Sequence, residues 1–264
     1  MDEPSVPSAA RTLARDSLLV APGYVIPGIV SLIGVPVLFG LLGAANYGIW
    51  ALMNSIASGV PPIATSSVEA LTLRYGHRSD GGFRLRELVV SVGASAGIGA
   101  ALGRIFVPDA STAAVAITGS LAVAISVYLL WMARLQSGLR FGAVSAVASI
   151  RAVIGLALAV AAAMATGSAT VAVAGLATGI SVTVLASAIV TNRRQLPRAP
   201  VAIQARKSST GRLSFGLGSV VVAVGLFELS VGDRFVMATF SNLSDLGIYA
   251  AVDTVEDLIL RFLP

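Results

Sequence analysis

The sequence predicts an all-α polytopic membrane protein, on the evidence of its composition, the length of its apolar runs and the placement of its charges. Of its 264 residues, 56% are hydrophobic and 12% are charged, and the mean hydropathy is +0.87. A soluble domain of this size needs more charged side chains to cover its surface. We therefore expect most of the chain to lie in a lipid bilayer.

Eight apolar runs are each long enough to form a transmembrane helix. A helix of about 20 residues crosses ~30 Å of hydrocarbon. The expected spans are 17–41, 47–73, 87–107, 111–133, 141–165, 169–191, 213–240 and 246–263. Residues 1–16 form a polar arm, and the apolar run after them is too long and too interrupted by proline for a cleaved signal peptide. The first run is therefore expected to remain as a span.

Lys and Arg lie on alternate loops, which sets the expected orientation. Loops rich in these residues stay in the cytoplasm, whereas the loops between them here carry none, apart from Arg104 near a helix end. The basic positions are Arg11, Arg15, Arg74, Arg78, Arg84, Arg86, Arg134, Arg140, Arg193, Arg194, Arg198, Arg206, Lys207 and Arg212. This pattern predicts a cytoplasmic amino terminus. It also indicates that the formal charge of +5 reflects the orientation of the chain in the membrane and does not indicate nucleic-acid binding.

The chemistry available to the chain is limited. Cysteine is absent and there is a single histidine, so disulfides, thiol catalysis and a metal centre are not expected, nor is a cofactor. The outward loops are only a few residues long, which disfavours a membrane enzyme because active sites concentrate on substantial loops. We expect no catalytic residue and no enzymatic activity.

A short motif occurs twice, as LLGAANYGIWAL over 41–52 and as FSNLSDLGIYAA over 240–251. Each copy is predicted to join two helices at the outer face, with an acidic or amide residue capping the second helix, a glycine allowing close backbone approach and an aromatic anchoring at the interface. The alternative is a pair of unrelated turns. The residues in these three roles are Asn46, Gly48 and Trp50 in the first copy and Asp245, Gly247 and Tyr249 in the second.

The spacing of the copies predicts the domain organisation. Gly48 and Gly247 are 199 residues apart, and six expected helices separate equivalent points. An even number of crossings preserves direction, so the copies belong to repeats of parallel topology. We expect a first transmembrane lobe of six helices over 17–191, a basic cytoplasmic linker over 192–212, and the first two helices of an incomplete second lobe over 213–264.

The stretch VPVLFGLLGAANYGIWALMNSIASG resembles the first helical hairpin of the bacterial polysaccharide flippases, in the multidrug, oligosaccharidyl-lipid and polysaccharide exporter superfamily. Asp233-Arg234 followed by DLGIYAA is similar to the seventh helix of that family and the motif after it. The resemblance implies that the chain moves an undecaprenyl-pyrophosphate-linked oligosaccharide across the bacterial cytoplasmic membrane by alternating access. It also implies membrane lipid, a polysaccharide polymerase and export machinery as partners. Family members usually have two complete lobes, so the chain is expected to be a fragment or a truncated member.

Ionisable residues within expected spans are the candidate functional residues, because burying a charge in the bilayer is costly. Arg151, near the middle of its span, is a candidate to bind pyrophosphate bidentately, and the alternative is a structural arginine satisfied by backbone carbonyls or a carboxylate. Glu228 lies at similar depth and is expected to face Arg151 as a gate. Glu69 and Arg74 are expected to form a local ion pair.

Asp233, Arg234 and Asp253 complete the candidate set. Arg234 is predicted as a second cationic contact near the exit, with a local Asp233 pair and a snorkelling arginine as the alternative. Asp253 and Glu228 are candidate carriers of a coupling proton or sodium ion, and Asp233 is grouped with them as a candidate gating or ion-coupling residue. Two other functions stay open: a small-cation multidrug exporter of the same superfamily, and a truncated membrane scaffold that does not transport.

Overall fold

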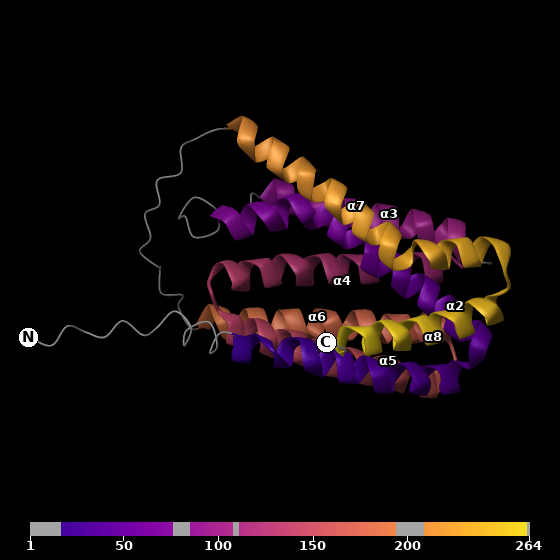
Figure 1. Ribbon diagram of the computed structural model, residues 1–264. Coiled ribbons are helices and arrows are strands. Elements are labelled where there is room, and N and C mark those ends of the chain that lie inside the picture. The colour runs from indigo at the N-terminus through magenta and orange to yellow at the C-terminus, as the bar shows by residue number, and fades with distance from the viewer. Residues whose placement is uncertain (1–16, 76–84, 108–110, 194–208, 263–264) are drawn as a thin grey trace, which may run out of the picture.

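The structure is a computed structural model that describes residues 17–75, 85–107, 111–193 and 209–262 (Figure 1). These residues are helical, with no strand among them. The arm over 1–16 and most of the expected linker lie outside the described residues. The helices are α2 (Pro22–Tyr75), α3 (Leu85–Phe106), α4 (Thr112–Ser137), α5 (Phe141–Thr166), α6 (Ala169–Arg193), α7 (Ser209–Phe240) and α8 (Leu243–Phe262).

Helix α2 contains a sharp break at Gly43, where φ is 71° and ψ is 165°. A residue with a side chain rarely adopts this conformation, so glycine permits the break. Figure 1 shows that the chain reverses direction there, so that the stretches before and after Gly43 run in opposite directions along the bundle. We call residues 22–42 the first arm of α2 and residues 44–75 its second arm. The sequence predicted two spans, 17–41 and 47–73, with a short turn, and the reversal takes a single residue instead.

Helix α2 is central to the bundle because it contacts each of the helices α3 to α8. The centre of the bundle is formed by large apolar side chains from α2, α4 and α6, including Leu52, Ile56, Leu121 and Ile180, each at most 1% exposed. Residues that are expected to span a membrane thus also supply a close-packed interior. This interior fixes the second arm of α2 as the element against which α7 and α8 are placed.

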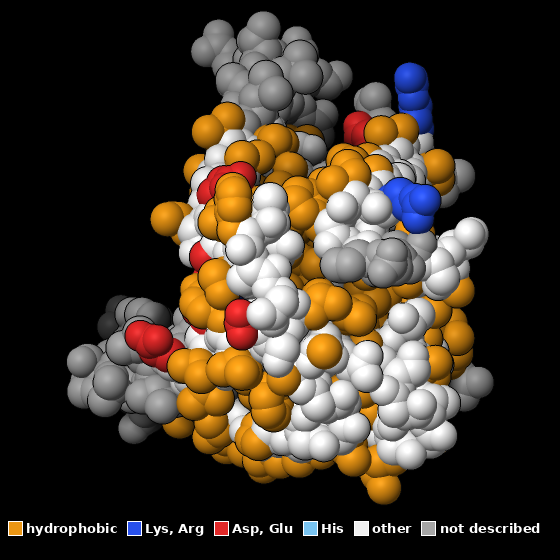
Figure 2. Space-filling view, turned by 90° about the vertical axis from the view of Figure 1, so that its right-hand side faces the viewer, with side chains coloured by type: hydrophobic (Ala, Val, Ile, Leu, Met, Phe, Trp, Pro, Cys, Tyr) orange, Lys and Arg blue, Asp and Glu red, His pale blue; other side chains and the backbone are white. Residues whose placement is uncertain are grey.

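Large apolar side chains also cover the outside of the bundle, as on Leu18, Val90, Ile105, Leu185 and Leu229. Figure 2, which views the bundle end on, shows hydrophobic atoms across that face and few Lys or Arg side chains. Exposed apolar surface of this extent suits contact with lipid. In the described chain, five helices are long and apolar enough to cross a membrane, counting α2 from Ser17 as one. The fold is that of an all-helical, multi-pass membrane protein.

Helices α7 and α8 are not among those five helices. The strongly apolar part of α7 is limited to Gly218–Leu229. Helix α8 carries Asp245, Asp253 and Glu256. The carboxylates of α8 need partners or water if the helix lies in a bilayer. The partner of one of them defines the candidate site.

Candidate functional site

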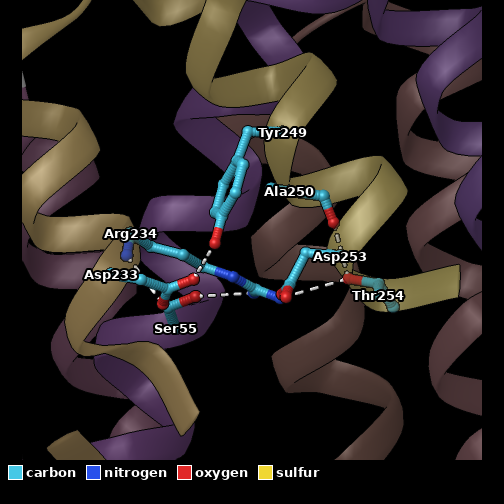
Figure 3. A network of polar contacts seen from close by, with 7 residues as sticks. All are labelled: Ser55, Asp233, Arg234, Tyr249, Ala250, Asp253 and Thr254. Carbon is cyan, nitrogen blue, oxygen red and sulfur yellow. Dashed lines mark hydrogen bonds and ion pairs between the residues drawn. The ribbon is translucent and has the colours of Figure 1, made fainter. Parts of the chain in front are cut away.

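A polar network joins α2, α7 and α8 around the guanidinium of Arg234 (Figure 3). Its Nη1 donates to Ser55 Oγ at 2.9 Å, and its Nη2 donates to Asp253 Oδ2 at 2.6 Å and to Thr254 Oγ1 at 3.2 Å. Thr254 in turn donates to the carbonyl of Ala250 at 2.7 Å, within its own helix. One side chain from α7 therefore ties together the second arm of α2 and α8. We call Ser55, Arg234, Asp253 and Thr254 the arginine site.

The arginine site is largely removed from solvent. Ser55 is 1% exposed, and the side chains of Arg234 and Asp253 are 13% and 32% exposed. Arg234 Nε is buried and has no hydrogen-bond partner. An arginine has five N–H donors in a planar fork suited to carboxylate or phosphate oxygens, so this guanidinium keeps donor capacity for a further acceptor.

A second carboxylate lies next to the arginine site. Asp233 Oδ2 accepts a hydrogen bond from the Tyr249 hydroxyl, and Asp233 Oδ1 accepts one from the backbone N–H of Arg234 at 2.8 Å. The sequence predicted Tyr249 as an interfacial anchor, whereas the structure gives its hydroxyl this specific acceptor. With Asp233 and Asp253 both ionised, the group carries two negative charges against one positive charge. The negative charge of Asp233 is therefore not balanced by a second cation among the groups that it is seen to bond.

The residues of the arginine site lie at different distances from the ends of their helices. Ser55 follows Gly43 by twelve residues, and Asp253 follows Leu243, the first residue of α8, by ten, which is roughly 15–18 Å along the helix axis. Arg234 lies six residues before the end of α7 at Phe240, about 9 Å along the axis, and its long side chain reaches the other two. Of the sequence-predicted residues, the structure thus brings Asp233, Arg234 and Asp253 together.

The two copies of the motif contact each other at their glycines. A Cβ added to Gly48 would collide with the carbonyl oxygen of Leu243, and one added to Gly247 would collide with that of Ala44. Leu243 and Ala44 each lie four residues before the glycine of their own copy, so the contact is locally two-fold. The predicted role of these glycines in close backbone approach is supported by this geometry.

The equivalence extends into the arginine site. Ser55 and Thr254 are separated by the same 199 residues as Gly48 and Gly247, and both hydroxyls accept from Arg234. Sequence reasoning missed Ser55 and Thr254 because each is an ordinary small polar residue in an apolar run. The repeat spacing is the signal that could have found them.

The predicted helix caps differ from the structure. The cap of α8 is Asn242, whose side-chain oxygen accepts from the Asp245 N–H at 2.9 Å, while its amide donates to Asp245 Oδ2 at 2.7 Å. The prediction that Asp245 caps α8 was wrong, because the helix begins three residues earlier. Asn46 donates to the carbonyl of Gly167 at 3.5 Å and caps no helix, since the second arm of α2 already begins at residue 44.

Trp50 is half-buried. Its ring stacks on Tyr47, with ring centroids 5.2 Å apart, and Tyr47 is fully buried. The indole Nε1 is buried and has no partner among the described residues. One edge of the ring thus packs within the bundle, and the role of an interfacial anchor stays a prediction.

Arg151 occupies a separate position on α5. Its guanidinium lies over the ring of Tyr128 on α4, 4.4 Å from the ring centroid, and its Nε is buried without a partner. Glu228 is exposed on α7, and α5 and α7 do not touch. The structure therefore does not bring Arg151 and Glu228 together, and the expected gate between them is not formed in this conformation.

The contact between Arg151 and Tyr128 is expected to contribute a measurable amount to the free energy of unfolding. Replacing Tyr128 by Leu is expected to remove a cation–π interaction of about 1 kcal/mol in addition to lost packing, whereas Tyr128→Phe keeps the aromatic face. Thermal unfolding in detergent measures both variants. Repeating them on an Arg151→Met background isolates the interaction, because the extra cost of the leucine is expected to shrink there. An equal cost on both backgrounds would show that the ring contributes packing alone.

An apolar cavity of about 610 Å³ lies between the first arm of α2 and α8. Its wall on α2 includes Val35 and Phe39, and its wall on α8 includes Val252 and Glu256. None of the residues that line the cavity belongs to the arginine site, because Ala251, Val252, Val255 and Glu256 lie on a different face of α8 from Asp253 and Thr254. The cavity and the arginine site are therefore separate features, and the cavity suits a hydrocarbon chain.

No protein-family model, curated protein or solved structure matches the chain.

Proposed function

We propose that the chain is a flippase component that translocates an undecaprenyl-pyrophosphate-linked oligosaccharide across the bacterial cytoplasmic membrane. The observation that carries the proposal is Arg234, a guanidinium in the middle of an apolar bundle with an unpartnered Nε and a single carboxylate bound to it. A diphosphate offers more acceptor oxygens than Asp253 and competes for the same fork. Arg151, with its own unpartnered Nε, is the second cationic contact.

Alternating access requires two halves that meet on one side and separate on the other. The repeated motif supplies the halves, since the copies run in the same direction in the proposed topology of eight crossings with a cytoplasmic amino terminus. The contact between Gly48 and Gly247 supports a state closed at the outer face. In the proposed cycle, ligand binding at Arg234 displaces Asp253 and loosens the link between α7 and α8.

Binding to the chain in lipid nanodiscs tests the proposal. Undecaprenyl diphosphate is expected to bind more tightly than undecaprenol. Arg234→Lys keeps the charge but loses the fork, and it is expected to weaken diphosphate binding by roughly tenfold, the equivalent of about 1.4 kcal/mol. Arg234→Gln is expected to weaken it further.

Arg134→Gln is the matched control, because Arg134 is exposed at the end of α4 and lies over the ring of Trp131. This variant is expected to bind as the unmodified chain does. Equal affinity for undecaprenol and its diphosphate would reject the proposal. Binding of a lipophilic cation such as ethidium in place of the diphosphate would favour the multidrug exporter. Retention of a partner protein with no lipid binding would favour the scaffold.

A further inference from the structure

Glu69, in the second arm of α2, bonds to a hydroxyl instead of to a cation. Its Oε1 lies within hydrogen-bond distance of Thr65 Oγ1, one turn earlier in the same helix. Among the described residues, no ion pair joins Glu69 to Arg74. The expected local pair was wrong, because the Glu69 carboxyl packs along its own helix toward Thr65.

Thr65 has two acceptors and one hydrogen. Its Oγ1 lies 2.8 Å from the carbonyl oxygen of Pro61 and within hydrogen-bond reach of the Glu69 carboxyl as well. A hydroxyl donates once, and Thr65 is 0% exposed, so no solvent reaches it to supply another donor. If both contacts are full hydrogen bonds, they need two hydrogens, and Thr65 supplies one. The Pro61 carbonyl has none, so the second comes from the Glu69 carboxyl.

The Thr65 hydrogen is best placed on the Pro61 carbonyl. Buried hydroxyls elsewhere in the bundle donate to the carbonyl four residues before them, as is usual for Ser and Thr inside helices. They are Thr72, Ser95, Thr118, Ser126 and Thr183, with distances of 2.7–3.0 Å. Thr65 has the same geometry toward Pro61. Its oxygen then faces Glu69 as an acceptor, so the hydrogen between them belongs to the carboxyl.

We propose that Glu69, Thr65 and the Pro61 carbonyl form a proton-binding site near the cytoplasmic end of α2. The protonated carboxyl donates to Thr65 Oγ1, and Thr65 donates to Pro61. Loss of the proton leaves two acceptors for one hydrogen, so the chain of hydrogen bonds breaks at one of its two contacts. Glu69 lies six residues before the end of α2, about 9 Å along the axis, within reach of the cytoplasmic interface. The inference does not depend on the transported substrate.

Several charged residues lie near the ends of helices on the same side of the bundle as Glu69. Arg74 lies on α2 itself, Arg86 and Glu87 lie in the first turn of α3, and Arg134 lies in the last turn of α4. Helix α7 packs here through Gly216, against Ser67. The side chain of Arg212, at the start of α7, lies outside the described residues. None of the described charges forms an ion pair with Glu69.

Infrared spectroscopy of the whole chain in proteoliposomes tests the site directly. A protonated carboxyl has a carbonyl stretching band separate from the carboxylate bands, and the band shifts in D₂O. At neutral pH this band is expected in the unmodified chain, lost in Glu69→Gln and kept in Thr65→Ser. In Thr65→Val, which has no hydroxyl to accept from the acid, the band is expected to remain but to shift.

Glu87→Gln is the matched control, because Glu87 is an exposed carboxyl on the same cytoplasmic side, and this variant is expected to keep the band. Identical acid bands in the unmodified chain and in Glu69→Gln would overturn the proposal. A band that does not move in Thr65→Val would also overturn it, since Thr65 would then not be the partner. Loss of the band on adding sodium chloride at constant pH would assign the three oxygens to sodium and reject the proton site.

Discussion

Replacing Gly247 by alanine is expected to force α8 away from the second arm of α2. The added Cβ would overlap the carbonyl oxygen of Ala44 and approach the backbone nitrogen of Gly48 to 3.0 Å. Both obstacles are backbone atoms, so no side-chain rotation relieves the overlap. Overpacking of this kind costs roughly 1–3 kcal/mol, and we expect the larger part of that range here. Thermal unfolding in detergent measures the loss, and Gly48→Ala is expected to match it.

The chain offers glycines that serve as controls. An added Cβ at Gly225 on α7, or at Gly93 on α3, meets nothing within 4 Å. Alanine also has the higher helix propensity by about 1 kcal/mol, so Gly225→Ala and Gly93→Ala are expected to leave the melting temperature unchanged or to raise it. If Gly247→Ala had the same melting temperature as these controls, the glycine contact would not stabilise the packing of α8 on the second arm of α2.

Removing Arg234 alone is expected to destabilise the bundle more than removing Arg234 and Asp253 together. Arg234→Gln leaves the Asp253 carboxylate without its cation between α7 and α8, and breaking a buried pair costs about 3–5 kcal/mol. Asp253→Asn leaves the guanidinium with Ser55 and Thr254 as its remaining partners. The double variant contains no unpaired charge at that contact, so part of the loss is expected to return.

A double-mutant cycle on the free energy of unfolding in detergent gives the coupling between the two side chains. We expect a coupling of more than about 1 kcal/mol, in the range typical of residues in direct contact. Asp245→Asn provides a comparison pair with Arg234, because Asp245 is exposed and bonds to Asn242. Its effect is expected to add to that of Arg234→Gln. Additive losses for Arg234 and Asp253 would mean that the ion pair does not link the helices.

Several parts of the fold follow from the sequence by simple physical rules. Long apolar runs predict membrane-crossing helices, and the structure contains such helices in α2 to α6. The repeated glycines predict a close backbone approach, and the two glycines lie against each other's helix. The cost of charges in a bilayer marked Asp233, Arg234 and Asp253 as candidates one by one, and the structure adds that Arg234 bonds to Asp253 through its guanidinium and to Asp233 through its backbone N–H.

Other parts depend on packing that residue patterns do not encode. Arg151 and Glu228 lie at similar predicted depth, but depth says nothing about rotation around the bundle, and their helices do not touch. The spacing of Glu69 and Arg74 predicted an ion pair, whereas the carboxyl contacts the hydroxyl of Thr65 one turn away. The start of α8 was placed too late because Asn242 and Asp245 are equally good caps by residue type.

The two motif copies also differ in charge. Ser55 and Thr254 are equivalent, but the position equivalent to Arg234, 199 residues earlier, is Val35, a buried residue in the wall of the apolar cavity. The repeated scaffold thus contains a guanidinium in one copy and an apolar side chain at the equivalent position of the other. A locally two-fold backbone therefore carries an asymmetric polar site, in which both hydroxyl oxygens of the repeat accept hydrogen bonds from the same arginine.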